Sequence, residues 1–67
     1  MNELKRYYIK IAGDDFEKAV DWTVVELDVV TTNMALGLPI HIVDINNNRI
    51  VINASFIIQI TLYELGV

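Results

Sequence analysis

The stretch from Gly37 to Tyr63 constrains the fold of this chain most, because it is almost free of charge and reads as β structure. It contains two β-rich runs, Pro39 to Ile45 and Arg49 to Asn53, joined by three consecutive asparagines. Asparagine tolerates the left-handed backbone that tight hairpins require. A third run, Phe56 to Glu64, follows a corner at residues 53–55. The sequence therefore predicts a β-hairpin followed directly by another strand.

The N-terminal segment predicts a further strand. Residues Leu4 to Ala12 alternate, with Tyr7 and Ile9 on one face and Arg6 and Tyr8 on the other. This alternation is typical of a half-buried strand. Gly-Asp-Asp at residues 13–15 then has the chemistry of a turn.

The middle of the chain carries the signals of a helix from Val24 to Leu36. Thr23 and Glu26 fit a capping box, in which each residue bonds to the backbone of the other. Gly37 stands where a left-handed residue ends a helix, and Pro39 follows it. The apolar spacing of one helical face supports the same span: Leu27, Val30, Thr31, Met34 and Leu38. A short strand is expected just before it, around Glu17 to Trp22.

Two alternatives for this segment stay open, because many of its residues are β-branched and favour strands. One is a long bent strand with a β-bulge at Val24 and Val25, where the apolar set changes phase. The other is a helix that begins already at Asp15.

Size and composition predict self-association. The chain has 67 residues, which allows one domain, and no cysteine that could form a disulfide or a thiolate metal site. Hydrophobic residues make up 54% of it, more than so small a core can hide. The strand at residues 56–64 is apolar on both faces, so we expect a homo-oligomer in which one of these faces is the subunit contact: Ile57, Gln59, Thr61 and Tyr63.

The expected fold class is α+β and mainly β: a small antiparallel sheet or partly open barrel of four to five strands with one helix. An all-β SH3-like barrel is the alternative. Gly-Leu-Pro-Ile at residues 37–40 and the run from Ile50 to Ile60 resemble the C-terminal half of small proteins of phages and Gram-positive bacteria. The strand-corner-strand ending is similar to the last two strands of SH3-like and Sm-like barrels. This resemblance implies a sheet domain that often forms dimers or rings, and no active site.

Charge and hydropathy indicate a cytoplasmic protein. The net charge of −4 argues against general binding to nucleic acid or to anionic membranes, which needs clustered cations. No signal peptide is visible at the N-terminus. No apolar run reaches the ~18 residues expected of a membrane-spanning helix.

Three polar motifs have a structural explanation that we favour over a functional one. Asp44 to Asn48 matches the start of a calcium-binding loop, but Arg49 stands where that loop needs glycine. His41 and Asp44 lie three residues apart on a strand, hence on opposite faces, and cannot share a metal ion or a proton. Asn53-Ala54-Ser55 is spelled like a glycosylation site but reads as a strand corner. No metal site or cofactor is predicted.

Charged residues suggest two further surfaces. Six acids lie between residues 14 and 28 and are the candidate site for a protein partner with a basic surface: Asp14, Asp15, Glu17, Asp21, Glu26 and Asp28. Basic and aromatic residues mix near the N-terminus, as in single-strand nucleic-acid binders, with Lys5 and Arg6 as the candidate contacts.

Our leading hypothesis is therefore a non-enzymatic, homo-oligomeric protein-interaction module, such as a phage or prophage accessory protein that modulates a host protein. The chain has one histidine, no cysteine and no phosphate-binding glycine loop, which argues against an enzyme. The alternative is an oligomer that holds a small ligand, for instance a nucleotide, by stacking on Tyr8, Trp22 and Tyr63. Nucleic-acid binding is the third and weakest hypothesis.

Overall fold

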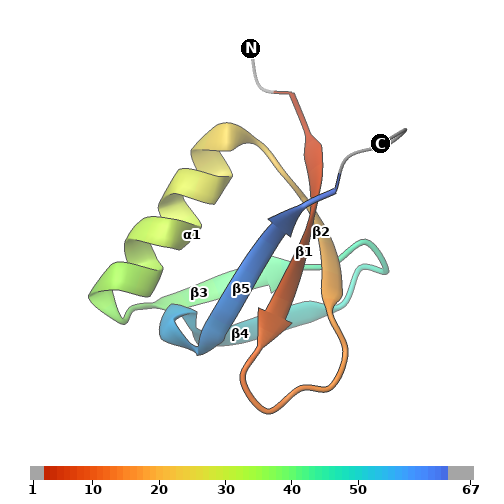
Figure 1. The fold of residues 1–67 in the computed structure, drawn as a ribbon. Coiled ribbons are helices and arrows are strands. Elements are labelled where there is room, and N and C mark those ends of the chain that lie inside the picture. Colours follow the sequence, from red (N-terminus) through yellow and green to blue (C-terminus); the bar gives the residue numbers. More distant parts are fainter. Residues whose placement is uncertain (1–2, 64–67) are drawn as a thin grey trace.

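Five strands, one α-helix and a short 3-10 helix make up the fold of residues 3–63, which a computed structural model describes (Figure 1). In chain order the elements are β1 (Lys5–Ile11), β2 (Lys18–Trp22), α1 (Val24–Leu36), β3 (Pro39–Val43), β4 (Arg49–Asn53), η1 (Ala54–Phe56) and β5 (Ile57–Leu62). The fold is thus α+β and mainly β, as the sequence predicts.

The strands form two antiparallel sheets. One has three strands in the order β2-β1-β5, and the other is the hairpin of β3 and β4. In the register of the larger sheet, Ile9 of β1 faces Lys18 of β2 and Ile60 of β5. The described strands do not close into a barrel, and residues 24–36 are helical, so the alternative of an all-β barrel is wrong.

Helix α1 begins and ends where the capping signals predict. Thr23 Oγ1 accepts a hydrogen bond from the Glu26 amide at 3.1 Å, and Glu26 Oε1 accepts one from the Thr23 amide at 3.3 Å. Gly37 ends the helix in the left-handed conformation, with φ 67°. The long bent strand and the helix starting at Asp15 are both wrong, because β2 occupies Lys18–Trp22 and the capping box fixes the first turn.

The predicted hairpin is present, with a turn held by Asp44. Its Oδ1 accepts hydrogen bonds from the amides of Asn46 and Asn48, both at 2.9 Å, and Asn47 has φ 65°. Strand β3 ends at Val43 rather than Ile45, because Asp44 starts the turn and the Ile45 amide donates to the Ala19 carbonyl of β2 at 2.9 Å. This bond joins the hairpin to the edge of the larger sheet.

Strand β5 contains a bulge, and because of it Ile57 lies on the opposite face from the one that the sequence predicts. Lys10 pairs with Gln59 and Ile11 with Ile57, so Ile58 is an extra residue on β5. Ile57 therefore turns into the core and is only 2% exposed, while Ile60 also packs against the core. The sequence placed Ile57 on an outward face with Gln59, and that placement is wrong because strict alternation fails at a bulge. The expected strand extended to Glu64, which lies outside the described residues.

One core lies between the two sheets and beneath α1 (Figure 1). Each sheet and the helix contribute to it, and η1 closes one end through the buried Ala54, whose amide donates to the Leu38 carbonyl at 2.8 Å. Its buried members are Tyr7, Ile9, Val20, Trp22, Val30, Ile40, Ile42, Ala54 and Ile57.

Candidate protein-binding groove

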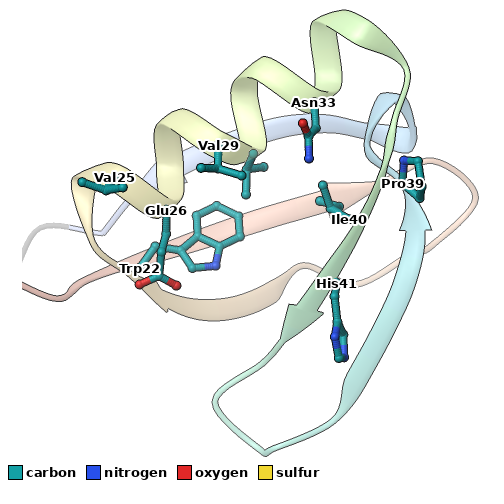
Figure 2. A pocket seen from close by; sticks show the side chains of 9 residues that line it. Trp22, Val25, Glu26, Val29, Asn33, Pro39, Ile40 and His41 are labelled. Carbon is teal, nitrogen blue, oxygen red and sulfur yellow. The ribbon is translucent and has the colours of Figure 1, made fainter.

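A groove of about 330 Å³ opens between α1, β3 and the end of β2 (Figure 2). It lies along the side of the core that α1 covers. Its lining consists of Trp22, Val25, Glu26, Val29, Val30, Asn33, Pro39, Ile40 and His41. We call this hollow the α1–β3 groove.

The floor of the α1–β3 groove is apolar and rigidly packed. Trp22, the last residue of β2, is 5% exposed, and its ring centroid lies 5.8 Å from that of Tyr7. Val30 and Ile40 are also buried and belong to the core. Because these side chains are fixed by the core, the floor is preformed, which lowers the entropic cost of binding.

The outer wall of the groove is an exposed ridge on α1. Val25 and Val29 lie one helical turn apart and are 61% and 54% exposed. On the other flank of the same two residues is a second hollow of about 290 Å³, which Asp28, Thr32 and Asn33 also line. We call Val25 and Val29 the α1 ridge, since a hollow borders it on each side.

The opposite wall is the unpaired edge of β3. The Asp44 amide donates to the Asn48 carbonyl and the Ala54 amide to the Leu38 carbonyl, so the even-numbered residues of this segment bond toward β4. Alternation of the ladder then directs the backbone groups of His41 and Val43 away from β4. Just beyond β3 the Ile45 amide on this edge donates to Ala19 of β2, but no strand within residues 3–63 pairs with β3 here, so the backbone groups of His41 and Val43 are available to another chain.

Few polar side chains reach the groove. Glu26 lies at the Trp22 end, where its carboxylate also closes the helix cap with Thr23. Asn33 lies toward Pro39 (Figure 2), and its side-chain amide has no hydrogen-bond partner among the described residues. The side chain of His41 points away from the helix (Figure 2). The lining includes one carboxylate and no Lys or Arg.

The six acids proposed as a partner site are not brought together. Those at positions 14, 15 and 17 lie in the loop between β1 and β2, at the opposite end of β2 from the start of α1 (Figure 1). Three of the six have partners in this chain: Asp14 binds Lys18 at 3.4 Å, Asp21 binds Arg6, and Glu26 caps the helix. The hydrogen bond from the Phe16 amide lowers the pKa of Asp14, with help from the charge of Lys18. The side chains of Asp15, Glu17 and Asp28 form no ion pair or hydrogen bond with other residues in the range 3–63.

The basic and aromatic residues of the N-terminal segment lie on both faces of the larger sheet. Arg6, Tyr8 and Lys10 share the outer face, whereas Lys5 falls on the inner side of β1 by alternation. Tyr8 meets Tyr63 edge-on, with ring centroids 5.6 Å apart, but Trp22 is buried on the other face. The three aromatics proposed for stacking therefore do not form one site. Arg6 and Asp21 border a hollow of about 390 Å³ together with Leu4 and Tyr63.

The side chains of Asp44 and Asn53 both form hydrogen bonds with nearby backbone groups. Hydrogen bonds from the Asn48 and Asn46 amides lower the pKa of Asp44, and Asn48 Nδ2 adds a third bond. Asn53 Oδ1 accepts from the Ser55 amide, and Asn53 Nδ2 donates to the Gly37 carbonyl. In the described part of the chain, no three His, Asp or Glu residues are grouped to hold a metal ion.

The residues proposed for the subunit contact are divided by the bulge of β5. Ile57 lies in the core of its own chain, whereas Gln59, Thr61 and Tyr63 are exposed on the outer face. The α1 ridge was not predicted as a site. Its signal is in the sequence, because α1 has no charged residue after Asp28 and its apolar residues surround the helix.

Comparison of the chain with family models, with curated proteins and with solved structures finds no match. None of the helices within residues 3–63 has the length and apolar character needed to cross a membrane.

Proposed function

We propose that this protein acts by binding another polypeptide chain in the α1–β3 groove, as a non-enzymatic interaction domain. The observation that carries the proposal is the α1 ridge: two aliphatic side chains exposed by more than half, beside a preformed apolar floor. Contiguous exposed apolar surface of this kind marks interaction sites in proteins.

The number of exposed hydrophobic side chains supports the same function. Fourteen large hydrophobic side chains are exposed in the described residues, whereas nine hydrophobic residues are buried. Single exposed apolar residues need no explanation, but here two lie side by side on one helix and border a concave surface. The unpaired edge of β3 adds backbone donors and acceptors, which extended chains use in sheet-edge recognition.

A photocrosslinking experiment tests this function. Val29 is replaced by p-benzoylphenylalanine, and the protein is irradiated in a lysate of its source organism. We expect a covalent adduct with a defined polypeptide, identified by mass spectrometry. The matched control carries the same residue at Val51, which is 70% exposed on the hairpin and does not line the groove.

The two positions separate specific binding from nonspecific contact. An adduct at position 29 that is absent at position 51 supports the groove as the binding site. No adduct at position 29, or equal adducts at both positions, would overturn the proposed function.

A further inference from the structure

We infer that the polypeptide in the α1–β3 groove is a second copy of this chain, bound through a two-fold interface in which α1 packs antiparallel to its counterpart. This inference rests on the proposed function and names the partner of the same site. It is carried by the composition of α1, by the shape of the surface around Val25 and Val29, and by the position of the helix charges.

Helix α1 carries apolar residues on the side that faces the core and on the side that faces outward. From Val29 to Leu36 the helix has no charged residue, and Val25, Val29 and Leu36 are all exposed. Several aliphatic side chains exposed together on one side of a helix favour burial of that side against a neighbour. Within one chain only Val30 is buried, with Leu27 and Met34 packed against the core. The outer side of α1 is therefore left for a neighbour.

The surface around the α1 ridge is self-complementary in shape. A two-fold interface brings the same patch of each copy together, so a fitting patch must present both a projection and a hollow. Val25 and Val29 supply the projection, and the hollows of about 330 and 290 Å³ on its two sides supply the recess. The ridge of one copy can thus enter the α1–β3 groove of the other, as in ridges-into-grooves packing.

The helix charges select the antiparallel orientation. Glu26 and Asp28 are the only charged residues of α1, and both lie near its N-terminus. A parallel pair would place the carboxylates of the two copies at the same height, where like charges repel. An antiparallel pair separates them and brings each N-terminal half beside a half that carries no charge. The two-fold axis then passes near the middle of the helix, close to Val29.

Oligomeric state under single substitutions tests the interface. We expect light scattering after size exclusion to give twice the chain mass of 7.6 kDa for the natural protein. Val29→Glu should weaken dimerisation by about tenfold or more, because it buries an unpaired charge. Glutamate has a better helix propensity than valine, so the monomer should stay folded, as circular dichroism will verify.

Two control variants make the test specific. Val51→Glu carries the same change on the hairpin, and Thr61→Glu places it on the exposed face of β5. Both should remain dimeric. A monomeric natural protein, a dimer that resists Val29→Glu, or a dimer dissociated by Thr61→Glu instead would overturn the inference.

The orientation is tested by single cysteines, since the chain has none of its own. In the antiparallel pair, the two copies of position 29 lie near the two-fold axis, whereas those of position 25 lie about 15 Å apart along the helix direction at ~1.5 Å per residue. Disulfides need Cα atoms within about 7 Å. Val29→Cys should therefore form a disulfide dimer on oxidation and Val25→Cys should not. Equal crosslinking of the two variants, or crosslinking of Val25→Cys alone, would contradict the antiparallel arrangement.

The crosslinking experiment distinguishes failure of this inference from failure of the proposed function. With p-benzoylphenylalanine at position 29, an adduct of two copies of the chain supports the inference. An adduct with a different polypeptide and none between copies would overturn the inference while leaving the groove as a binding site. Absence of any adduct would overturn both.

Discussion

Arg6 of β1 and Asp21 of β2 face each other across the strand pair and share two parallel hydrogen bonds, Nε to Oδ1 at 2.9 Å and Nη2 to Oδ2 at 3.1 Å. This bidentate geometry is the strongest form of arginine–carboxylate pairing. It removes Arg6 from the cations that the N-terminal strand could offer a nucleic acid. It also gives the fold a pH-dependent contact on an exposed face.

Asp21→Asn should lower stability only where the natural carboxylate is ionised. The hydrogen bond from Arg6, followed by the charge of Arg6, lowers the pKa of Asp21 in the folded protein. A depressed pKa stabilises the fold above the ordinary pKa of Asp, and this contribution is lost as the pH falls through the folded pKa. The difference in free energy of unfolding between natural protein and variant should thus be constant near neutral pH and vanish in acid.

Urea unfolding, followed by Trp22 fluorescence across pH, measures this difference. It should be small and should shrink in salt, because both side chains are about 40% exposed. Asp15→Asn is the control, since Asp15 has no ion pair among residues 3–63. Identical pH profiles for the two variants would rule out a specific contribution from the pair.

Ile9→Ala should destabilise the protein severely. Ile9 is fully buried at the centre of the larger sheet, between β2 and β5. Removing its side chain leaves a cavity and costs about 3 kcal/mol, most of what a domain of this size possesses. Ile58→Ala is the matched control, because the bulge leaves Ile58 59% exposed and its loss should cost no more than about 0.5 kcal/mol. Chemical unfolding compares the two, and similar losses would contradict the inward turn of β5 at Ile57.

Thr23→Ala should destabilise the fold by about 1 kcal/mol, because the Glu26 amide loses its acceptor and the capping box opens. Thr23→Ser keeps the hydroxyl and should restore most of the stability. The midpoint of thermal unfolding, measured by circular dichroism at 222 nm, reports both changes. If alanine and serine at position 23 were equally stable, the cap would not be the feature that starts α1.

Asn47→Ala should cost about 1 kcal/mol, because φ 65° places Cβ close to the following carbonyl oxygen. Asn47→Gly should be at least as stable as the natural protein in unfolding experiments, since glycine adopts this conformation without strain. Asn46→Ala provides the comparison, since the Asn46 contact with Asp44 is made by its backbone amide. A loss at position 46 as large as at position 47 would show that asparagine side chains, rather than the backbone conformation, determine this turn.

The sequence by itself determined the elements whose causes are local. The capping box of Thr23 and Glu26, together with the left-handed Gly37, sets both ends of α1, since each depends on residues within one turn. The hairpin around Asn47 and the corner at Asn53 follow from side chains that bond to backbone two residues away. Such signals survive in a single sequence because they involve short separations along the chain.

Only the tertiary structure decided how these elements face one another. The bulge at Ile58 depends on pairing with Lys10 and Ile11, which lie more than forty residues earlier in the chain, so alternation within β5 misplaced Ile57. Trp22 became the floor of a groove, not a stacking platform, because Tyr7 and the core cover it. The exposed ridge at Val25 and Val29 exists because the core takes Leu27, Val30 and Met34 from the other side of the same helix. The helical spacing predicts that Leu27, Val30 and Met34 share a face, and the structure buries that face. Whether the aliphatic residues on the opposite side are covered depends on contacts between distant residues that no local pattern specifies.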